Sequence, residues 1–547
     1  MDLHPYDAVV VGTGATGGMT ALTLAEQGIK VLIIEAGPLL KREQTYSDEP
    51  IDTLKRINNF VLKRHSNQIQ HPGYWKNSPD LYANEKKYPY MYPKDKPFLW
   101  TQGKQLGGRS LTWGGITLRL SPKDFHPSAT DSFGTDWPIT YDELSPHYDF
   151  VEKSLGIFGK TDYLEQIPDG NYIGEVPLTK SELYFGNQIR SKLNYPFIQS
   201  RGFDKNTATR EKEWPRSSSV GSSLQRAFKT GNVQILPNHL VESFETNQET
   251  ELATRLKIVN TNNGFKSELN CELLFLCAST ICSLRILLNS EKKSNYSGFH
   301  DSSGKLGKYL MDHVSISKFF GLPNINEFTS GTIDQAPLSG AGSFFIPFGS
   351  KLPNDIKIDF LRGYGIWGAI DRLGIPNFLK KEKNESIGFL ISHGEVLPRE
   401  TNKVELSNQI DDWDIPIPII KFKWSENELK MIEHMKDSML KAIKSSGGEV
   451  KGVKDMIKIP FLNMLEKTSL ALSGEIPPPG YYIHEVGGAP MGSKEDNSVL
   501  DKWNRLWRCK NVFVLDGACW PTSSWQSPTL TMMAISRRAS LGIKKLI

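Results

Sequence analysis

Three glycines and one glutamate near the start of the chain have the types and spacing that bind a dinucleotide. Gly12, Gly14 and Gly17 form a G-x-G-x-x-G pattern, and Glu35 follows 23 positions after Gly12. In such a pattern the first glycine lets the turn close, the second lets backbone amides approach a pyrophosphate, and the third lets a helix pack closely on a strand. The carboxylate of Glu35 can accept hydrogen bonds from a ribose diol and would repel a 2′-phosphate, which favours FAD or NAD over NADP.

The segments around these residues are those that a dinucleotide site needs. The valine-rich run that ends at Val11 predicts a buried strand, and Val31 to Ile34 predicts a second one. Between them, Met19 to Gln27 predicts a helix closed by Gly28, and the N–H groups at its start would face the phosphates. The alternative is an ordinary strand–helix connection, because a glycine-rich turn alone is weak evidence.

The composition is that of a globular protein with more than one ordinary core. The chain has 547 residues, of which 38% are hydrophobic and 23% are charged. This length predicts two domains or one elaborated large domain. The formal charge of +4 is small and no long Lys/Arg block is present, so neither nucleic acid nor a membrane is expected as a necessary partner.

Cysteine usage and apolar runs argue against a disulfide framework and a membrane span. The five cysteines form no C-x-x-C pair, and nothing in the sequence indicates a structural metal. The most apolar stretch, Leu273 to Leu288, is interrupted by polar residues and by Arg285. The first strand begins within six residues of the N-terminus, which leaves no room for a secretory signal, so we expect a cytoplasmic enzyme.

A second glycine-rich segment lies between Gly103 and Gly115, with five glycines in thirteen positions. This density indicates backbone that approaches another group closely, or else a loop with several turns. Residues 40–97 and 160–215 are expected to be irregular. Between them, Thr140 and Glu143 have the spacing of a capping box and predict a helix that ends near Leu155.

Later segments repeat the strand–turn–helix pattern of the N-terminus. Leu273 to Ala278 predicts a buried strand followed by a helix from Ile281 to Asn289, and Glu426 to Ser446 predicts an amphipathic helix. Near the end of the chain, Ser527 is expected as the N-cap of a last helix, with Pro528 at its first position.

A short strand near the C-terminus is expected to return to the dinucleotide site. Asn511 to Leu515 predicts a buried strand that ends in Asp516 and Gly517. Because ligands of open parallel sheets lie beyond the carboxyl ends of the strands, these residues and Gly12 are predicted to share one crevice.

Five separated motifs resemble those of the glucose-methanol-choline (GMC) flavoprotein oxidoreductases. In chain order they are Gly12 to Glu35, Gly103 to Gly115, Leu274 to Leu288, Gly307 to His313, and His484 to Leu530. Their order and spacing span nearly the whole chain, which is more specific than any single motif. Gly107-Gly108-x-Ser110-x-x-Trp113 and Asp136-Trp137-Pro138 look most similar to the bacterial sugar dehydrogenases and pyranose oxidases of this family.

The resemblance implies an α/β fold with a Rossmann-like FAD-binding domain and a second, substrate-binding domain built on a large antiparallel sheet. It assigns residues 1–45, 98–125, 220–315 and 481–547 to the first domain and residues 126–219 and 316–480 to the second, with 46–97 as an excursion that covers the site. Together with the glycine pattern, it implies that FAD is bound by Gly12, Gly14, Ala15, Thr16, Gly17, Glu35, Ala36, Gly107, Ser110, Trp113, Gly114, Gly115, Val241, Asp516, Gly517, Pro528 and Thr529.

Some members of the family attach FAD covalently through a histidine just before the tryptophan of the glycine loop. Thr112 stands at that position here, so FAD is expected to be non-covalent. Trp113, Trp520 and Trp525 lie near the motifs and suit stacking on a sugar-like ring, although burial in the core is the favoured role for any one of them.

By the resemblance, His484 is the active-site histidine that faces the flavin N5 region across the substrate. An imidazole with an ordinary pKa near 6.5 can take a hydroxyl proton at neutral pH while the adjoining carbon delivers hydride to FAD. The family usually places a second histidine or an asparagine where Ser527 stands, and serine is no base near pH 7. Ser527 is thus a second catalytic candidate or only a helix cap, with Gln526 as an alternative assistant. His313 is interpreted as structural.

The sequence therefore predicts an FAD-dependent enzyme that oxidises a hydroxyl group of an alcohol or sugar-like substrate to a carbonyl, with a dehydrogenase preferred to an oxidase. A separate acceptor (oxygen, a quinone or a protein) takes the electrons. A GMC-fold lyase and a flavin-binding protein without turnover are the alternatives. A plain NAD enzyme is disfavoured by the late Asp516-Gly517 and Ser527 to Thr529 elements.

Overall fold

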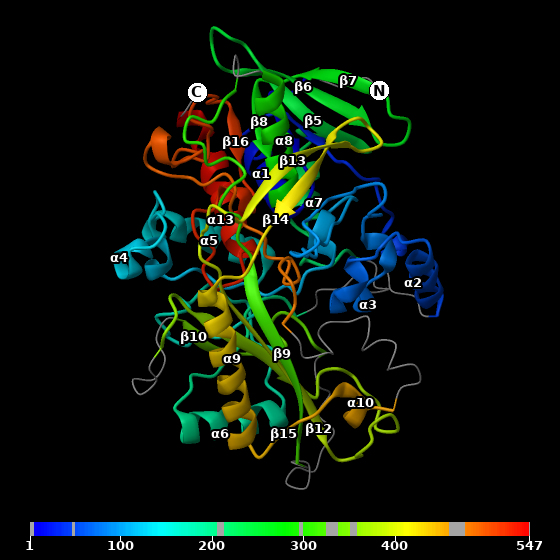
Figure 1. Cartoon of the computed structure of the whole chain (residues 1–547), viewed down its shortest axis with the longest axis vertical. Coiled ribbons are helices and arrows are strands. Elements are labelled where there is room, and N and C mark those ends of the chain that lie inside the picture. The colour runs from blue at the N-terminus through cyan, green and yellow to red at the C-terminus, as the bar shows by residue number, and fades with distance from the viewer. Residues whose placement is uncertain are drawn as a thin grey trace.

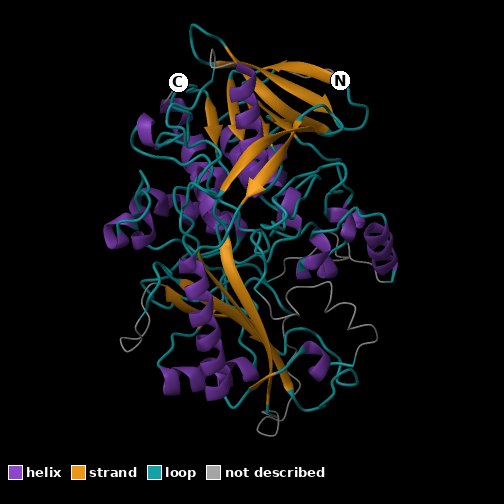
Figure 2. Ribbon diagram, viewed as in Figure 1, coloured by secondary structure: helices purple, strands orange, loops and turns teal. Residues whose placement is uncertain are grey.

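The computed structural model of the chain describes residues 5–45, 50–204, 213–294, 299–323, 337–349, 358–458 and 476–545. The α-helices among these residues are α1 (Ala15–Ala25), α2 (Ile51–Val61), α3 (Pro72–Lys76), α4 (Ser128–Asp131), α5 (Tyr141–Leu155), α6 (Lys180–Leu193), α7 (Ser223–Lys229), α8 (Thr280–Ser294), α9 (Glu426–Ser445), α10 (Val453–Met456) and α13 (Thr529–Leu541). Two sheets lie toward opposite ends of the long axis (Figure 1), and loops fill much of the region between them (Figure 2).

A five-stranded parallel sheet is built around the N-terminal strand. Its order is β16 (Val512–Val514), β8 (Leu273–Leu276), β1 (Ala8–Val11), β2 (Val31–Ile34) and β4 (Val233–Leu236). Every pair is parallel and in unbroken register, with Val9 opposite Leu32 and Leu274. Helix α1 connects β1 to β2, and helix α8 follows β8. The two helices pack mainly on opposite faces of the sheet, because Leu22 of α1 belongs to one core and Ile281 of α8 to the other.

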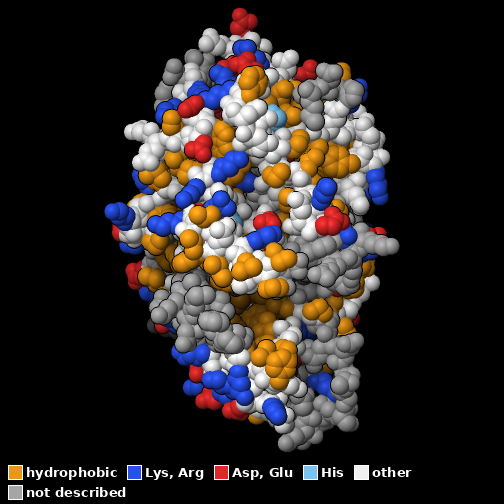
Figure 3. Space-filling view, turned by 90° about the vertical axis from the view of Figure 1, so that its right-hand side faces the viewer, with side chains coloured by type: hydrophobic (Ala, Val, Ile, Leu, Met, Phe, Trp, Pro, Cys, Tyr) orange, Lys and Arg blue, Asp and Glu red, His pale blue; other side chains and the backbone are white. Residues whose placement is uncertain are grey.

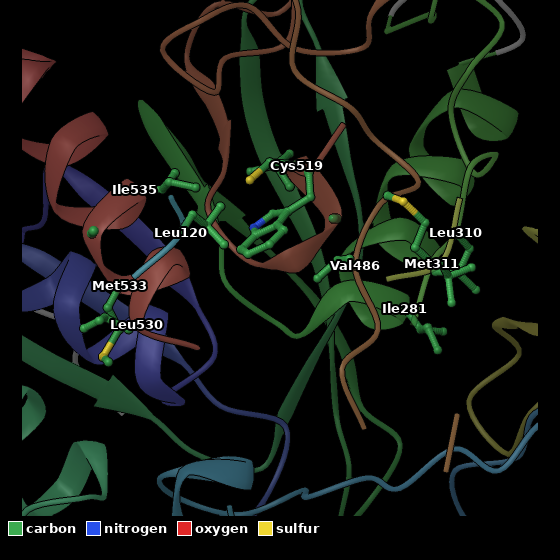
Figure 4. Packing of buried hydrophobic residues seen from close by; sticks show 14 of the residues in the cluster. Leu120, Ile281, Leu310, Met311, Val486, Cys519, Leu530, Met533 and Ile535 are labelled. Atoms are coloured by element: carbon green, nitrogen blue, oxygen red, sulfur yellow. The ribbon is translucent and has the colours of Figure 1, made fainter. Parts of the chain in front are cut away.

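Both faces of the parallel sheet are buried, as its unbroken apolar strands predict. Ala8 and Val10 belong to one core that includes Leu22 of α1 and Leu224 of α7. Val9 and Val11 belong to a larger core on the opposite face, which continues into α8 and the C-terminal segment. Figure 4 shows this larger core, where Leu120, Ile281, Val486, Cys519 and Leu530 converge from segments far apart in the sequence.

The second large sheet is antiparallel and has six strands. Its order is β15 (Glu449–Val450), β9 (His313–Leu322), β12 (Ser386–Glu395), β11 (Tyr364–Ile370), β10 (Phe344–Gly349) and β3 (Ile198–Gln199). Helix α9 packs on β9 and β12 through apolar side chains such as Met431 and Met435. The parallel and antiparallel sheets together confirm the predicted α/β fold with two domains.

Two smaller sheets pack on helix α8 of the parallel-sheet domain. One is the meander β5 (His239–Thr246), β6 (Ala253–Asn260) and β7 (Lys266–Asn270), and the other is the hairpin β13 (Lys403–Ile410) and β14 (Pro416–Lys421). The hairpin lies in a segment that the sequence assigned to the second domain, yet it contacts α8 of the first. The segment boundaries stay a prediction.

Several helix predictions are confirmed and others need correction. The Thr140 capping box forms, and α5 ends at Leu155 as predicted. Helix α1 begins at Ala15 rather than Met19, because the chain becomes helical directly after the turn at Gly14. Residues 160–215 are not irregular throughout, since α6 lies there behind a second capping box formed by Thr179.

Residues 40–97 also contain a helix, α2, which the expectation of an irregular excursion missed. Its buried residues are polar, namely Asp52, Arg56 and Asn59. The guanidinium of Arg56 donates to the carbonyl oxygens of Tyr74 and Asn77, at 3.3 and 3.0 Å. The helix is therefore held by buried hydrogen bonds rather than by an apolar stripe facing the core.

The start of the last helix is shifted by one residue from the prediction. Pro528, not Ser527, is the N-cap of α13, and its carbonyl accepts from the Met532 N–H at 2.9 Å. Pro528 already has helical dihedral angles, with φ −77° and ψ −20°, which the proline ring permits. Ser527 thus lies just outside the helix, with its side chain released from the predicted capping role.

Within the described residues, no helix combines the length and the apolar composition needed to cross a bilayer. Basic and acidic side chains are interspersed on the face shown in Figure 3, in keeping with the small formal charge of +4. The cytoplasmic location expected from the sequence stays a prediction.

Candidate active site

A cavity of about 410 Å³ lies where the carboxyl ends of the parallel strands face the antiparallel sheet. The antiparallel sheet contributes Ser315 and Ser317 of β9, Trp367 of β11 and Ile391 of β12 to its wall. Of the residues predicted from the sequence, those that line it are Gly12, Gly14, Ala15, Thr16, Glu35, Ala36, Ser110, Trp113, Gly114, Gly115, Val241, His484, Asp516, Gly517, Ser527, Pro528 and Thr529. Seven separate stretches of sequence thus meet in one cavity.

The glycine turn at the start of α1 leaves an open cradle. A Cβ atom on Gly17 would lie 2.0 Å from the carbonyl oxygen of Gly12, so this glycine is required for close packing of helix and strand. A Cβ atom on Gly14 would meet no described atom within 4 Å, because Gly14 faces the cavity. No described side chain caps the N-terminus of α1, so its N–H groups and positive dipole end are available to an anion.

Glu35 ends β2 with its carboxylate at the rim of the same cavity. Its Oε2 accepts from the Thr13 hydroxyl at 2.5 Å and from the Thr13 N–H at 3.1 Å, while Oε1 accepts from the Gly37 N–H at 2.9 Å. Burial raises the pKa of Glu35, and these donors together with Lys104 oppose that shift. The donors fix the orientation of the carboxylate and leave acceptor capacity for a ribose hydroxyl.

The second glycine loop is tied to the first by side-chain hydroxyls. The Gly107 N–H donates to the Thr13 hydroxyl at 2.9 Å, and the Ser110 hydroxyl donates to the Gly107 carbonyl at 2.6 Å. The Ser219 N–H donates in turn to Ser110 at 3.0 Å. Gly107 and Gly17 are the two predicted residues outside the cavity wall, and both shape the loops that form it.

The tryptophans predicted to stack on substrate divide into two groups. Trp113 lines the cavity, and its indole N–H donates to the Ser217 carbonyl at 2.9 Å. Trp520 is fully buried and packs edge-on against Trp137, while Trp525 belongs to a small core cluster with Phe345. The favoured role, burial in the core, is confirmed for Trp520 and Trp525, and neither lines the cavity.

Asp516 and Gly517 stand beside a buried ion pair at the cavity wall. Asp516 accepts from the Ser283 hydroxyl at 2.5 Å and the Ala518 N–H at 3.0 Å, and burial raises its pKa to about 6. Nearby, Arg109 donates to Glu485 at 2.8 Å and to the Ser279 hydroxyl at 2.9 Å. Within the described residues, Glu485 Oε1 is buried without a hydrogen-bond partner.

His484 reaches the cavity from a sharply turned segment. Ile483 before it adopts a left-handed φ of +63°, and the N–H of His484 donates to Asp312 Oδ1 at 3.0 Å. On the side away from the cavity, Nδ1 of His484 lies 2.8 Å from Nδ1 of His313. Burial first, and then His313, His393 and Arg109, lower the pKa of His484 well below 6.5, so its imidazole is neutral at neutral pH.

A third histidine, His393 of β12, lies close to His313. His393 lies 5.5 Å from His313, measured between ring centroids, and stacks on Tyr482 at 4.8 Å. The Trp367 indole donates to the Tyr482 oxygen at 3.2 Å, so the Tyr482 hydroxyl hydrogen is free to be donated to His393 Nδ1, 2.9 Å away. This network joins the cavity wall to the antiparallel sheet.

Ser527 and Gln526 differ in their access to the cavity. Ser527 lines it. Gln526 is fully buried and points elsewhere: its amide donates to Asp124 at 2.8 Å and to the Gln166 carbonyl at 3.1 Å, and its oxygen accepts from Ser524. The suggestion that Gln526 assists catalysis is therefore wrong, because both of its polar atoms are used in the interior.

Sequence reasoning missed several polar residues of this region. Asp312 and His313 flank His484, and His313, interpreted from the sequence as structural, contacts His484 directly. Arg109 and Lys104 line the cavity but were passed over as loop residues. A usable signal was present for the first pair, because an Asp-His dipeptide closes the Gly307 to His313 motif. Within the described residues, no group of three or more His, Cys, Asp or Glu is arranged to hold a metal.

The residues present fit FAD. The open cradle at Gly14, the uncapped start of α1 and the oriented carboxylate of Glu35 suit a pyrophosphate and a ribose. The same cavity extends to Asp516, His484 and Thr529. The fold and this site define a flavoprotein class with a dinucleotide domain set against an antiparallel-sheet domain.

Comparisons with known proteins place the chain in a family. A model described as FAD binding domain matches residues 7–110, and one described as GMC oxidoreductase matches residues 398–536. The chain belongs to the GMC oxidoreductase family.

The chain is also similar to curated enzymes over nearly its whole length. It is 25% identical to 2-methyl-1,2-propanediol dehydrogenase of Mycolicibacterium austroafricanum over 97% of this chain and 94% of that protein. It is 23% identical to the fructose dehydrogenase large subunit of Gluconobacter japonicus, over 98% and 97% of the two chains. It is 24% identical to paromamine 6'-oxidase of Streptomyces fradiae, over 99% and 92%.

Solved structures share the fold at lower identity. Pyridoxine 4-oxidase from Mesorbium loti matches with a TM-score of 0.62 and 16% identity, over 99% of each chain. Formate oxidase of Aspergillus oryzae RIB40, in a structure concerned with FAD modification, matches with a TM-score of 0.63 and 16% identity over the full length of both. These likenesses show the fold.

Proposed function

We propose that the protein is an FAD-dependent dehydrogenase that oxidises a hydroxyl group of an alcohol or sugar-like substrate to a carbonyl, by hydride transfer to N5 of the flavin. The observation that carries this proposal is the presence of the dinucleotide cradle and His484 in one cavity. Relatives named for the oxidation of a diol and of fructose support the substrate class.

The chain's own residues perform the proton half of this reaction. His484 is neutral, so it can accept the hydroxyl proton while the C–H bond of the same carbon breaks and the carbonyl forms. FAD, when bound, supplies the acceptor for the hydride. Ser527 lines the cavity and, freed from the helix cap, is proposed to hydrogen-bond the substrate oxygen. The seventeen predicted cofactor-binding residues are proposed to hold FAD, and the two-domain segmentation is part of the same proposal.

We further propose that FAD is bound without a covalent link, because Thr112 rather than a histidine stands before Trp113 and lines the cavity. A dehydrogenase is preferred to an oxidase, with a quinone, oxygen or a protein as the separate electron acceptor. Trichloroacetic acid precipitation tests the first point, since non-covalent flavin stays in the supernatant.

The function itself is tested by anaerobic flavin bleaching. Purified protein is expected to be yellow, and at least one member of a panel of diols, sugars and simple alcohols should bleach its absorbance. Reoxidation of the bleached protein by oxygen or by a soluble quinone then identifies the acceptor. Failure of the whole panel, together with turnover of a cyanohydrin, would instead favour a lyase, and failure of both would favour a flavin-binding protein without turnover.

The rate constant of flavin reduction should be insensitive to pH from neutral down to below 6.5. His484 must be neutral to accept a proton, and its pKa lies well below 6.5. The groups that face it are His313, His393, Arg109, Asp312 and Tyr482. Because the lowered pKa keeps the imidazole neutral, protonation of His484 removes activity only as the pH falls through that lowered value. Burial, and then Glu485, raise the pKa of Asp312 to about 7, but Asp312 holds the main-chain N–H of His484 and takes no substrate proton. Stopped-flow reduction over a pH series checks this, and an acid limb at or above 6.5 would contradict it.

A further inference from the structure

His313 is a buried histidine whose two ring nitrogens meet two different partners. Its Nε2 lies 2.8 Å from the carbonyl oxygen of Ser524, and its Nδ1 lies 2.8 Å from Nδ1 of His484. Only 2% of its surface is exposed, and it is absent from the cavity wall. It touches the base of the proposed reaction without being able to touch a substrate.

These contacts determine where the hydrogens lie. A carbonyl oxygen can only accept, so Nε2 of His313 carries the hydrogen of that bond. A neutral imidazole carries one N–H, which leaves a lone pair on Nδ1 of His313. The hydrogen between the two rings therefore belongs to Nδ1 of His484, and Nε2 of His484 keeps its lone pair.

His484 can donate this hydrogen bond to His313 only while His313 is neutral. Burial lowers the pKa of His313 to about 4, so its ring is neutral at neutral pH and at any pH well above 4. A protonated His313 would present N–H groups at both nitrogens and would reverse the bond to His484.

The backbone around the pair is fixed by neighbouring residues. The carboxylate of Asp312, adjacent to His313, accepts from the N–H groups of His484 at 3.0 Å and Gly480 at 2.8 Å. Ser524, whose carbonyl receives the His313 hydrogen, has a left-handed φ of +59°, a conformation that non-glycine residues seldom adopt. Asp312 thus holds the main chain of His484, and the next residue, His313, holds its ring.

We propose that His313 is a positioning residue that fixes His484 in the tautomer with hydrogen on Nδ1 and a bare Nε2 toward the cavity. This inference rests on the proposed role of His484 as base and adds what prepares it for that role. When Nε2 takes the hydroxyl proton, His484 becomes an imidazolium that still donates from Nδ1 to His313. No proton passes to His313, and the charge is stabilised by the same bond.

Ser527, the other catalytic candidate in the cavity wall, cannot act as a base near pH 7. His484 is then the one proposed base, and His313, which is absent from the wall, orients its ring.

Two substitutions separate this role from simple packing. In His313→Asn the amide oxygen can still accept from His484 Nδ1, whereas His313→Leu offers no acceptor. Both variants lose the bond to Ser524, so they share that cost. Each is compared with the unsubstituted protein in two measurements on FAD-loaded enzyme: the ¹⁵N spectrum of histidine-labelled protein, with the His484 signals identified by their loss in His484→Ala, and the anaerobic rate of flavin reduction as a function of substrate concentration.

The unsubstituted protein and His313→Asn should show His484 protonated at Nδ1 and bare at Nε2. His313→Leu should show a mixture of tautomers, with flavin reduction slowed by roughly tenfold to a hundredfold at saturating substrate and the substrate dissociation constant unchanged. A hydrogen on Nε2 in the unsubstituted protein would overturn the proposal, as would a leucine variant that keeps both tautomer and rate. If no alcohol reduces the flavin, the proposed function fails while the tautomer still decides the role of His313. If His313→Leu does not fold, the unsubstituted and asparagine spectra decide it.

Discussion

Replacing His484 with alanine is expected to slow flavin reduction by roughly a hundredfold to ten-thousandfold, the range in which a positioned general base contributes. The loss follows from removing the neutral imidazole that lines the cavity. FAD should still bind, because the glycine turn, Glu35 and the second glycine loop all lie on other segments. Stopped-flow spectroscopy under anaerobic conditions measures the rate, and the flavin absorbance per protein measures occupancy.

A matched control is His126→Ala. The His126 side chain is half exposed, its contact with Asp136 is 3.9 Å long, and it does not line the cavity. Reduction of its flavin should proceed at the native rate. If His484→Ala also reduced at the native rate with full FAD occupancy, the base would have to be another group.

The dinucleotide half of the site could be predicted from sequence because its determinants are local. Gly12, Gly14 and Gly17 specify a turn by their own conformational freedom, and the spacing from Gly12 to Glu35 holds that turn, one helix and one strand. The structure places Gly12 at φ +103° and Gly17 against its carbonyl, as those roles require. Local spacing also predicts the capping box of α5. The same spacing is present at Thr179 and Glu182 before α6, within the polar residues 160–215.

The contacts that orient His484 and that hold Gln526 away from the cavity could not be predicted, because they join segments that are remote in the sequence. His313 and His484 are 171 positions apart, and the partner that removes Gln526 from the cavity, Asp124, is 402 positions away. Neither contact leaves a periodic or spacing signal in the chain. The capping prediction for Ser527 was wrong by one residue. The sequence placed Pro528 at the first helical position, whereas in the structure Pro528 is the N-cap and the helix begins at Thr529.

A comparison of Gly14→Ala with Gly17→Ala is expected to separate cofactor binding from folding. At Gly14 the added methyl group meets no described protein atom within 4 Å and points into the cavity, and its φ of −66° is open to alanine. The apoprotein should therefore unfold within about 1 kcal/mol of the unsubstituted protein, the scale of an N-cap change. FAD affinity should fall by roughly tenfold to a hundredfold, because the methyl group occupies the space where the phosphates would approach the backbone.

Gly17→Ala should behave in the opposite way. Its Cβ atom would lie 2.0 Å from the backbone carbonyl oxygen of Gly12, which cannot move without displacing β1 from α1. The apoprotein itself should lose about 1–3 kcal/mol of unfolding free energy, the usual cost of overpacking. Denaturant unfolding of apoprotein and FAD titration by fluorescence quenching measure the two quantities separately. Equal FAD affinity in Gly14→Ala and the unsubstituted protein would mean that the cofactor does not enter over this turn, and the glycine pattern would then serve only to pack α1 on the sheet.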